Sequence, residues 1–147
     1  MLHLETITKD NWIKAISLRV REDQEKFVAS NAVSLAQLNF LNDFHAKGIY
    51  LGVEMIGFAL YGMDEDDHEY WIYRMMIDQK HQGKGYGKEA IKLVIDDIKM
   101  IKEDRHKTIT LSYEPTNEHA KRVYEKVGFK EIDGLMISDE QVSRFTF

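Results

Sequence analysis

Gln82-Gly83-Lys84-Gly85-Tyr86-Gly87-Lys88 is the most informative stretch of this 147-residue chain. It lies between Tyr70 to Ile77, an apolar run that predicts a strand, and Gly85 to Lys102, where apolar residues recur at helical spacing. Glycines let the backbone approach a ligand closely, and the start of the following helix adds about half a positive charge. The stretch therefore predicts a cradle for a phosphate group.

Two common nucleotide-binding patterns do not match this loop. The Walker pattern requires Ser or Thr after its lysine, whereas Lys88 is followed by Glu89. The Rossmann pattern places its third glycine one residue later than Gly87, and it belongs to a first strand–helix–strand unit that is missing ahead of the loop. A tight turn without a ligand is the plain alternative.

Apolar periodicity away from the loop predicts an α/β (α+β) fold. Alternation in the first half favours an antiparallel meander, and strand–helix–strand order in the second half favours parallel pairing. We expect a mixed, mostly antiparallel sheet of six to seven strands with helices on both faces. The expected strands are Leu2 to Thr6, Ile49 to Val53, Ile56 to Tyr61, Tyr70 to Ile77, Thr108 to Tyr113 and two that meet near Ser138-Asp139. The expected helices follow Asp10, run through Arg21 to Ala29, extend from Ser34 through Phe44 to a stop at Gly48, and cover Gly85 to Lys102 and Asn117 to Lys126.

Composition narrows the class of protein. The net charge is −5, which argues against a nucleic-acid partner. Without cysteine there can be no disulfide, thiolate ligand or cysteine nucleophile, and the six histidines show no H-x-x-x-H spacing, so no metal site is expected. No 18-residue apolar stretch and no signal peptide are seen, so we expect a cytoplasmic protein without a membrane partner.

The loop and its surroundings resemble the GNAT family of N-acetyltransferases. The signature Gln/Arg-x-x-Gly-x-Gly/Ala of that family matches Gln82 to Gly87 position by position. Met75-Met76-Ile77 in the preceding strand and Asn117 with Tyr124 seven residues later extend the resemblance. It implies the GNAT fold, with residues 1–147 forming a single N-acetyltransferase domain.

The resemblance also implies how acetyl-coenzyme A, the co-substrate, is held. The backbone of Met75, Met76 and Ile77 would pair with the pantetheine arm as an added strand. Gln82 and the backbone amides of Gly83, Lys84, Gly85, Tyr86, Gly87 and Lys88 would hold the pyrophosphate. Asn117 would bond the cofactor near the pantetheine, and Tyr124 would protonate the leaving thiolate. Periodicity alone would make Tyr124 a core tyrosine.

The acceptor amine must attack the thioester directly in a ternary complex, because the chain has no cysteine. An amine of pKa about 10.4 is neutral in roughly one molecule in 10³ at pH 7, so a base or a water relay is needed. Relatives often carry a carboxylate two positions before the pantetheine-binding stretch, where this chain has Tyr73 followed by Arg74. Glu69 on the same strand is the expected base. Glu22, Asp23, Glu25, His68 and His119 stay open as alternatives.

The N-terminal half resembles the bacterial spermine/spermidine branch of the family at Arg21 to Asn31, Ser34 to Gln37 and Gly57 to Gly62. A polyamine acceptor is therefore expected, with Glu22 and Glu25 as substrate-binding carboxylates. The candidate cation–π partners are Phe27, Tyr61, Tyr70 and Trp71. The alternatives are another small-molecule amine (an aminoglycoside or an amino acid), a protein N-terminus, or a non-catalytic module that senses acetyl-coenzyme A or polyamine. A homodimer is compatible with the sequence. The acidic stretch Asp64 to Glu69 is expected to be a solvated turn.

Overall fold

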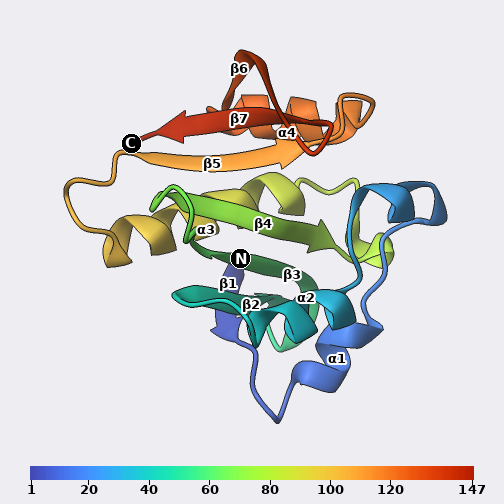
Figure 1. The fold of residues 1–147 in the computed structure, drawn as a ribbon. Helices are drawn as coiled ribbons and strands as arrows, with labels where there is room; N and C mark the ends of the chain where they lie inside the picture. The colour runs from blue at the N-terminus through green and yellow to red at the C-terminus, as the bar shows by residue number, and fades with distance from the viewer.

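The computed structural model describes residues 1–147, which form a seven-stranded mixed sheet in the order β1-β2-β3-β4-β5-β7-β6 (Figure 1). All neighbouring strands are antiparallel except β4 and β5, which confirms the expected fold class. The elements, in chain order, are β1 (Leu2–Thr6), α1 (Trp12–Ser17), the 3-10 helix η1 (Glu22–Phe27), α2 (Asn31–Leu38), β2 (Phe44–Leu51), β3 (Glu54–Met63), β4 (Tyr70–Ile77), the 3-10 helix η2 (Gln79–His81), α3 (Tyr86–Ile101), β5 (Thr108–Tyr113), α4 (Glu118–Val127), β6 (Lys130–Ile137) and β7 (Glu140–Thr146).

The sheet opens between β4 and β5. These two strands pair only at Tyr70 with Ile109 and at Trp71 with Thr110. Just beyond, β4 carries a bulge at Tyr73, because its neighbours Ile72 and Arg74 pair with consecutive residues of β3. A bulge bends its strand and increases the local twist. The edge of β4 that faces β5 is therefore without a strand partner over the last six residues of β4.

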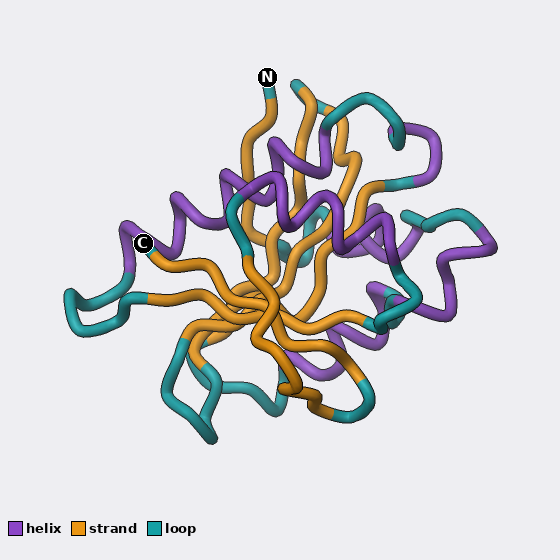
Figure 2. The backbone as a smooth tube through the Cα atoms, turned by 90° about the horizontal axis from the view of Figure 1, so that it is seen from above, coloured by secondary structure: helices purple, strands orange, loops and turns teal.

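Helices cover both faces of the sheet, as expected. Seen from above, the strands cross at successive angles, as the twist of a sheet requires (Figure 2). Residues of α1 and α2 pack on one face in a cluster that includes Ala15, Leu18 and Phe58. Residues of α3 and α4 pack on the other face in a larger cluster around Ile91 and Phe129.

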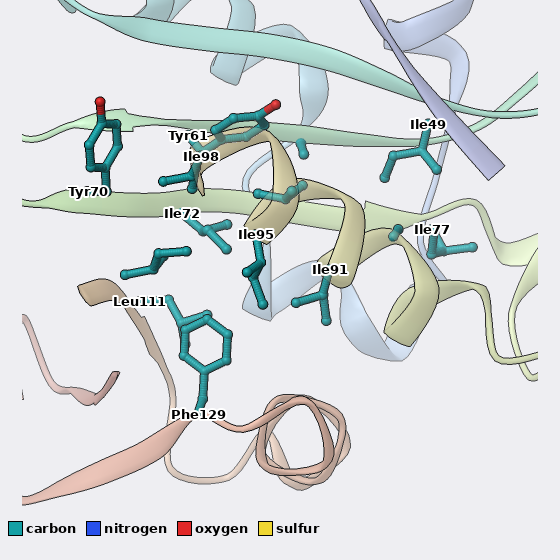
Figure 3. Close-up of a cluster of buried hydrophobic side chains, with 14 of the residues drawn as sticks. Ile49, Tyr61, Tyr70, Ile72, Ile77, Ile91, Ile95, Ile98, Leu111 and Phe129 are labelled. Carbon is teal, nitrogen blue, oxygen red and sulfur yellow. The ribbon is translucent and has the colours of Figure 1, made fainter. Parts of the chain in front are cut away.

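The periodicity of α3 is the clearest local determinant of the fold. Its buried residues, which recur three or four positions apart, are Ala90, Ile91, Val94, Ile95 and Ile98. Figure 3 shows Ile91, Ile95 and Ile98 together with strand residues such as Ile72 and Leu111. Burying each such side chain stabilises the fold by about 1.5–3 kcal/mol. This packing fixes where the helix begins, at the glycine loop.

The helix expected from Ser34 through Phe44 to a stop at Gly48 is wrong at both ends. Its N-cap is Ser30, whose hydroxyl accepts a hydrogen bond from the backbone N–H of Val33, and the helix ends at Leu38. The segment from Phe44 to Gly48 belongs to β2, where it pairs with β3. Strand pairing outweighs the helical spacing of Leu41 and Phe44, since the ladder satisfies every backbone group on that side.

Of the predicted turns and helix caps, some are confirmed and others are wrong. The expected strands Ile49 to Val53 and Ile56 to Tyr61 leave Glu54-Met55 as the hairpin turn between them, and this prediction is wrong. The turn between β2 and β3 is at Gly52-Val53, because Gly52 supplies the positive φ of 62° that the turn needs. The N-cap of α1 is Asn11 instead of Asp10. The turn at Ser138-Asp139 between β6 and β7 is confirmed, with φ of 50° and 64°. No helix of the chain is both long enough and apolar enough to cross a membrane.

Candidate active site

The glycine loop presents a row of free backbone amides. None of the N–H groups from Gly83 to Lys88 donates a hydrogen bond within the chain. Gly83 and Gly85 have φ of 79° and 83°, and a Cβ added to either would meet no atom within 4 Å. Gly85 is also the N-cap of α3, so the positive end of that helix faces the same space. These observations fit a cradle for the pyrophosphate of coenzyme A.

Gln82 fastens the loop to its surroundings. Its side-chain amide nitrogen donates to Gln24 Oε1 of η1 and to the backbone oxygen of Ile77, both at 2.9 Å. The side chain therefore joins three segments: the end of β4, the loop and η1. These two hydrogen bonds hold the loop in position.

Two clefts lie beside the open edge of β4. The loop-side cleft has a volume of about 290 Å³ and is lined by the loop, the ends of β4 and α4, and part of η1. Its lining includes Gln82, Gly83, Gly85, Tyr86, Gly87 and Lys88. The strand-side cleft has a volume of about 500 Å³ and is lined by η1, β4, β5 and the start of β7.

The two clefts share a common wall. Its residues come from η1, β4 and α4, and they are Phe27, Val28, Met75, Asn117, Ala120 and Tyr124. A molecule in one cleft and a molecule in the other would therefore meet at these six residues. This arrangement suits the transfer of a group between two substrates that are bound at once.

Tyr124 is part of this wall, with its ring packed against other aromatic rings and its hydroxyl without a hydrogen-bond partner in the chain. Its ring stacks on Tyr113, with centroids 6.0 Å apart and an interplanar angle of 7°, and meets Phe129 edge-on at 5.5 Å. Burial raises the pKa of Tyr124 well above its ordinary value, and the electrostatic effect of the nearby Tyr113 adds a smaller rise. No hydrogen bond contributes to that shift. The hydroxyl is thus a protonated donor without a partner in the chain. The role of catalytic proton donor stays a prediction for this residue.

Asn117 and the Met75–Ile77 segment all line the loop-side cleft. Asn117 is the N-cap of α4, and its Oδ1 accepts a hydrogen bond from the Ala120 N–H at 3.3 Å. Its side-chain amide nitrogen is left without a partner, and the residue lines both clefts. Met75, Met76 and Ile77 line the loop-side cleft along the open edge of β4.

The predicted carboxylates are not brought together. Glu25 of η1 lines the strand-side cleft, whereas Glu22, three residues earlier, lines neither cleft. Glu69 directly precedes β4, six positions and therefore about 20 Å of extended chain before Met75. It also lines neither cleft. Of the three, only Glu25 is placed to contact an acceptor.

The candidate cation–π residues divide in the same way. Phe27 belongs to the shared wall. Tyr61 is fully buried and donates a hydrogen bond to Asp97, and Tyr70 is buried in the same core cluster. Trp71 donates to Asp67 of the acidic turn. Among these four rings, only that of Phe27 can face a substrate in either cleft.

The strand-side cleft contains polar groups that sequence reasoning missed. They are Arg74, Ser112, Tyr113 and Glu140. Arg74 appeared only as a departure from the family pattern, and Glu140 follows a turn with no local motif around it. Only the insertion of β7 beside β5 brings Glu140 to this cleft. No local pattern in the sequence could have found it.

Arg74 is a half-buried cation without a carboxylate partner. Its guanidinium donates to the backbone oxygen of Tyr73 and to Gln37 Oε1, at 2.9 and 3.1 Å, and its buried Nε donates to nothing. Burial lowers the pKa of Arg74, and the negative charge of Glu140 opposes that shift. The guanidinium links the bulge of β4 to α2.

Positive charge gathers at α4 near the loop-side cleft. Burial lowers the pKa of His119, and the neighbouring charges of Arg122, Arg21 and Lys126 lower it further. His119 and Lys126 line the cleft. No group of three or more metal-ligating side chains occurs in the structure.

Comparison with known proteins identifies the family. The pattern that describes the acetyltransferase (GNAT) family matches residues 4–129. The chain belongs to the GNAT family. The spermine/spermidine N(1)-acetyltransferase of Bacillus subtilis (strain 168) is 31% identical over 96% of this chain and 95% of its own length. The probable spermine N(1)-acetyltransferase of Bacillus subtilis subsp. natto (strain BEST195) has the same identity and coverage.

Solved structures share the fold of this GNAT protein. The aminoglycoside acetyltransferase AAC(6')-Ib in complex with coenzyme A superimposes with a TM-score of 0.81 at 17% identity, over 99% of this chain and 95% of that one. The PaiA N-acetyltransferase of Thermoplasma acidophilum, also in complex with coenzyme A, superimposes with a TM-score of 0.70 at 15% identity, over 100% of this chain and 99% of that one. The family and the fitting loop together make this chain an acetyl-coenzyme A-dependent N-acetyltransferase.

Proposed function

We propose that this acetyltransferase transfers the acetyl group to a primary amine of spermidine, spermine or a related diamine. The observation that carries the proposal is the pair of clefts that share Met75, Asn117 and Tyr124. The relatives that match along almost the whole chain are named as spermine or spermidine acetyltransferases. Glu25, Glu140 and the ring of Phe27 give the strand-side cleft groups that attract ammonium.

The residues divide the work between the clefts. The amides of Gly83 to Lys88 would hold the pyrophosphate, and the open edge of β4 at Met75 to Ile77 would pair with the pantetheine arm. The side-chain amide of Asn117 would donate to that arm. The acceptor amine would approach through the strand-side cleft, so that its nitrogen meets the thioester carbonyl at the shared wall.

The chain then handles charge and protons. A backbone N–H near Ile77 would donate to the thioester carbonyl oxygen as the amine attacks its carbon. As the carbon–sulfur bond breaks, Tyr124 would give its phenolic proton to the sulfur. The ammonium proton of the acceptor would leave to water before attack, and the proton that the nitrogen loses after attack would return through water to the Tyr124 oxygen. Glu69 directly precedes β4 and lines neither cleft, so it has no role in this scheme.

An amine that also carries a carboxylate, such as an amino acid, is the second candidate acceptor. Arg74 favours it, because this cation in the strand-side cleft has no carboxylate partner in the chain. Coulomb repulsion from Arg74 would oppose a second ammonium, whereas a substrate carboxylate would be attracted.

A thiol-release assay with acetyl-coenzyme A against a matched panel of amines tests the proposal. The panel contains spermine, spermidine, 1,4-diaminobutane, butylamine, lysine and an aminoglycoside. We expect kcat/KM for the polyamines to exceed that for butylamine and lysine by at least about tenfold. A preference for lysine would favour the second candidate. Thiol release with none of the amines would indicate a protein N-terminus as acceptor or a module that only binds.

A further inference from the structure

Glu140 is the better fixed of the two carboxylates in the strand-side cleft. It is the first residue of β7, directly after the tight turn at Ser138-Asp139. Because β7 lies between β5 and β6, Glu140 reaches the end of β5 near Tyr113, in the same cleft as Met75 and Tyr124. Glu25, the other carboxylate, is exposed on a short 3-10 helix.

Ser112 holds one oxygen of this carboxylate. The Ser112 hydroxyl donates to Glu140 Oε1 at 2.8 Å, across 28 positions of the chain. Glu140 Oε2 accepts no hydrogen bond within the chain, and Glu140 forms no ion pair within 4.0 Å. A partly buried carboxylate of this kind is oriented by the protein but keeps one oxygen available to a ligand.

The chemistry of that oxygen points to a cationic ligand. An ionised carboxylate only accepts hydrogen bonds, and its strongest partners are charged N–H donors such as ammonium. A carboxylate whose rotamer is already fixed loses little conformational entropy on binding, whereas Glu25 must be ordered first. Arg74 is close enough for its charge to interact with that of Glu140.

We propose that Glu140, held by Ser112, binds the ammonium group of the acceptor in the strand-side cleft. This assignment rests on the proposed function only in that the acceptor is an amine. Glu140 therefore determines affinity for the acceptor, and the loop-side cleft determines affinity for acetyl-coenzyme A. Glu140 is then a second carboxylate contact of the acceptor, beside Glu25.

Steady-state kinetics of Glu140→Gln test the assignment. Gln keeps the size of the side chain and an oxygen for Ser112, but removes the charge. We expect KM for the best amine of the panel to rise by at least about tenfold, with KM for acetyl-coenzyme A unchanged. Glu140→Asp keeps the charge and should recover part of that loss. Asp139→Asn, one residue away and lining neither cleft, removes the same charge and should leave both constants unchanged.

The outcomes separate this assignment from the choice of acceptor. If the wild type acetylates an amine and Glu140→Gln keeps its KM within about threefold, the assignment is overturned whichever amine it is. An equal rise in Glu140→Gln and Asp139→Asn also overturns it, since the effect would then be one of net charge. If polyamines are not substrates but Glu140→Gln weakens another amine as expected, the proposed acceptor fails and the role of Glu140 stands.

Discussion

At the scale of single residues, the protonation of Tyr124 decides what this side chain can do. Its hydroxyl has no partner in the chain, and burial raises its pKa. Tyr113, stacked against it, has its hydroxyl bonded to Glu131 Oε2 at 3.0 Å. Two adjacent tyrosines thus differ in one respect: only Tyr124 has a proton to offer to a substrate. The pair provides a matched control.

Tyr124→Phe keeps the ring packing and removes the proton donor. We expect the rate of acetyl transfer to fall by roughly 10²-fold or more, with affinity for coenzyme A retained. Single-turnover kinetics measure this rate without product release, and calorimetry measures the affinity. Tyr113→Phe should change the rate by less than about threefold. Equal rates in Tyr124→Phe and the wild type would leave Tyr124 as a core residue.

The pH profile offers a second test at this scale. Tyr124 acts in its protonated form, and a raised pKa extends that form to higher pH. As pH rises, the acceptor amine loses its proton and becomes nucleophilic. We therefore expect kcat to rise with pH up to about pH 10, without a decline caused by Tyr124. A decline below about pH 9 in the wild type that is missing in Tyr124→Phe would contradict the raised pKa.

At the scale of elements, the glycine loop and the acidic turn differ in how they are built. The loop leaves its amides free and its glycines facing open space. The acidic turn between β3 and β4 is internally bonded: Asp64 accepts hydrogen bonds from the Asp66 and Asp67 N–H groups and from the Tyr73 hydroxyl. The free amides of the loop are available to a ligand, whereas the polar groups of the acidic turn bond to one another.

Gly85→Asp places a side chain and a negative charge in the cradle. We expect loss of measurable coenzyme A binding by calorimetry, because both changes oppose a pyrophosphate. Gly134→Asp is the matched control, since Gly134 also has a positive φ, 73°, with no atom within 4 Å of an added Cβ. It carries the same backbone strain outside both clefts. Affinity in Gly85→Asp within about threefold of that in Gly134→Asp would refute the assignment of the loop.

Tyr73→Phe tests the acidic turn through pH. Burial alone would raise the pKa of Asp64, but the hydrogen bonds from Tyr73 and from the backbone outweigh it and lower that pKa. A carboxyl whose pKa is lowered on folding adds stability above its unfolded pKa of about 3.9, and loses it as pH falls through the folded value. Tyr73→Phe should therefore lower Tm at pH 7 and have little effect near pH 2.5.

Thermal unfolding followed by circular dichroism measures both values of Tm. In an Asp64→Asn background the effect of Tyr73→Phe should no longer depend on pH, because the titrating group is gone. A loss of Tm that is equal at both pH values in the Asp64 protein would mean that Tyr73 contributes through packing on Phe44 alone, with ring centroids 4.4 Å apart.

At the scale of the whole molecule, the net charge of −5 attracts a polycation generally, but the placement of charge decides where it binds. Exposed carboxylates act through a Debye length near 8 Å at about 0.15 M salt, so remote ones contribute little. Glu25 lines the acceptor side of the shared wall, whereas Glu65 and Asp66 lie in the exposed turn.

Neutralising Glu22 and Glu25 to Gln should raise KM for spermidine by at least tenfold, about 1.4 kcal/mol, and leave KM for acetyl-coenzyme A unchanged. Most of that rise should appear in Glu25→Gln alone, because Glu22 lines neither cleft. Neutralising Asp64, Glu65 and Asp66 should change KM by less than about threefold. The reverse order would place the acceptor against the acidic turn.

Features with local causes are predictable from the amino-acid sequence alone. The glycine spacing from Gly83 to Gly87, the periodicity of α3 and the cap at Asn117 each act within a few residues, and their patterns therefore predict the loop, the helix and the family. The turn at Ser138-Asp139 was predictable for the same reason.

Only the tertiary structure decided the acceptor side. The end of α2 at Leu38 depends on β2 pairing with β3, and the opening of the sheet depends on the bulge at Tyr73. Glu140 reaches Ser112 because β7 inserts between β5 and β6. These contacts join residues far apart in the chain, so no local pattern around either partner specifies which residues meet.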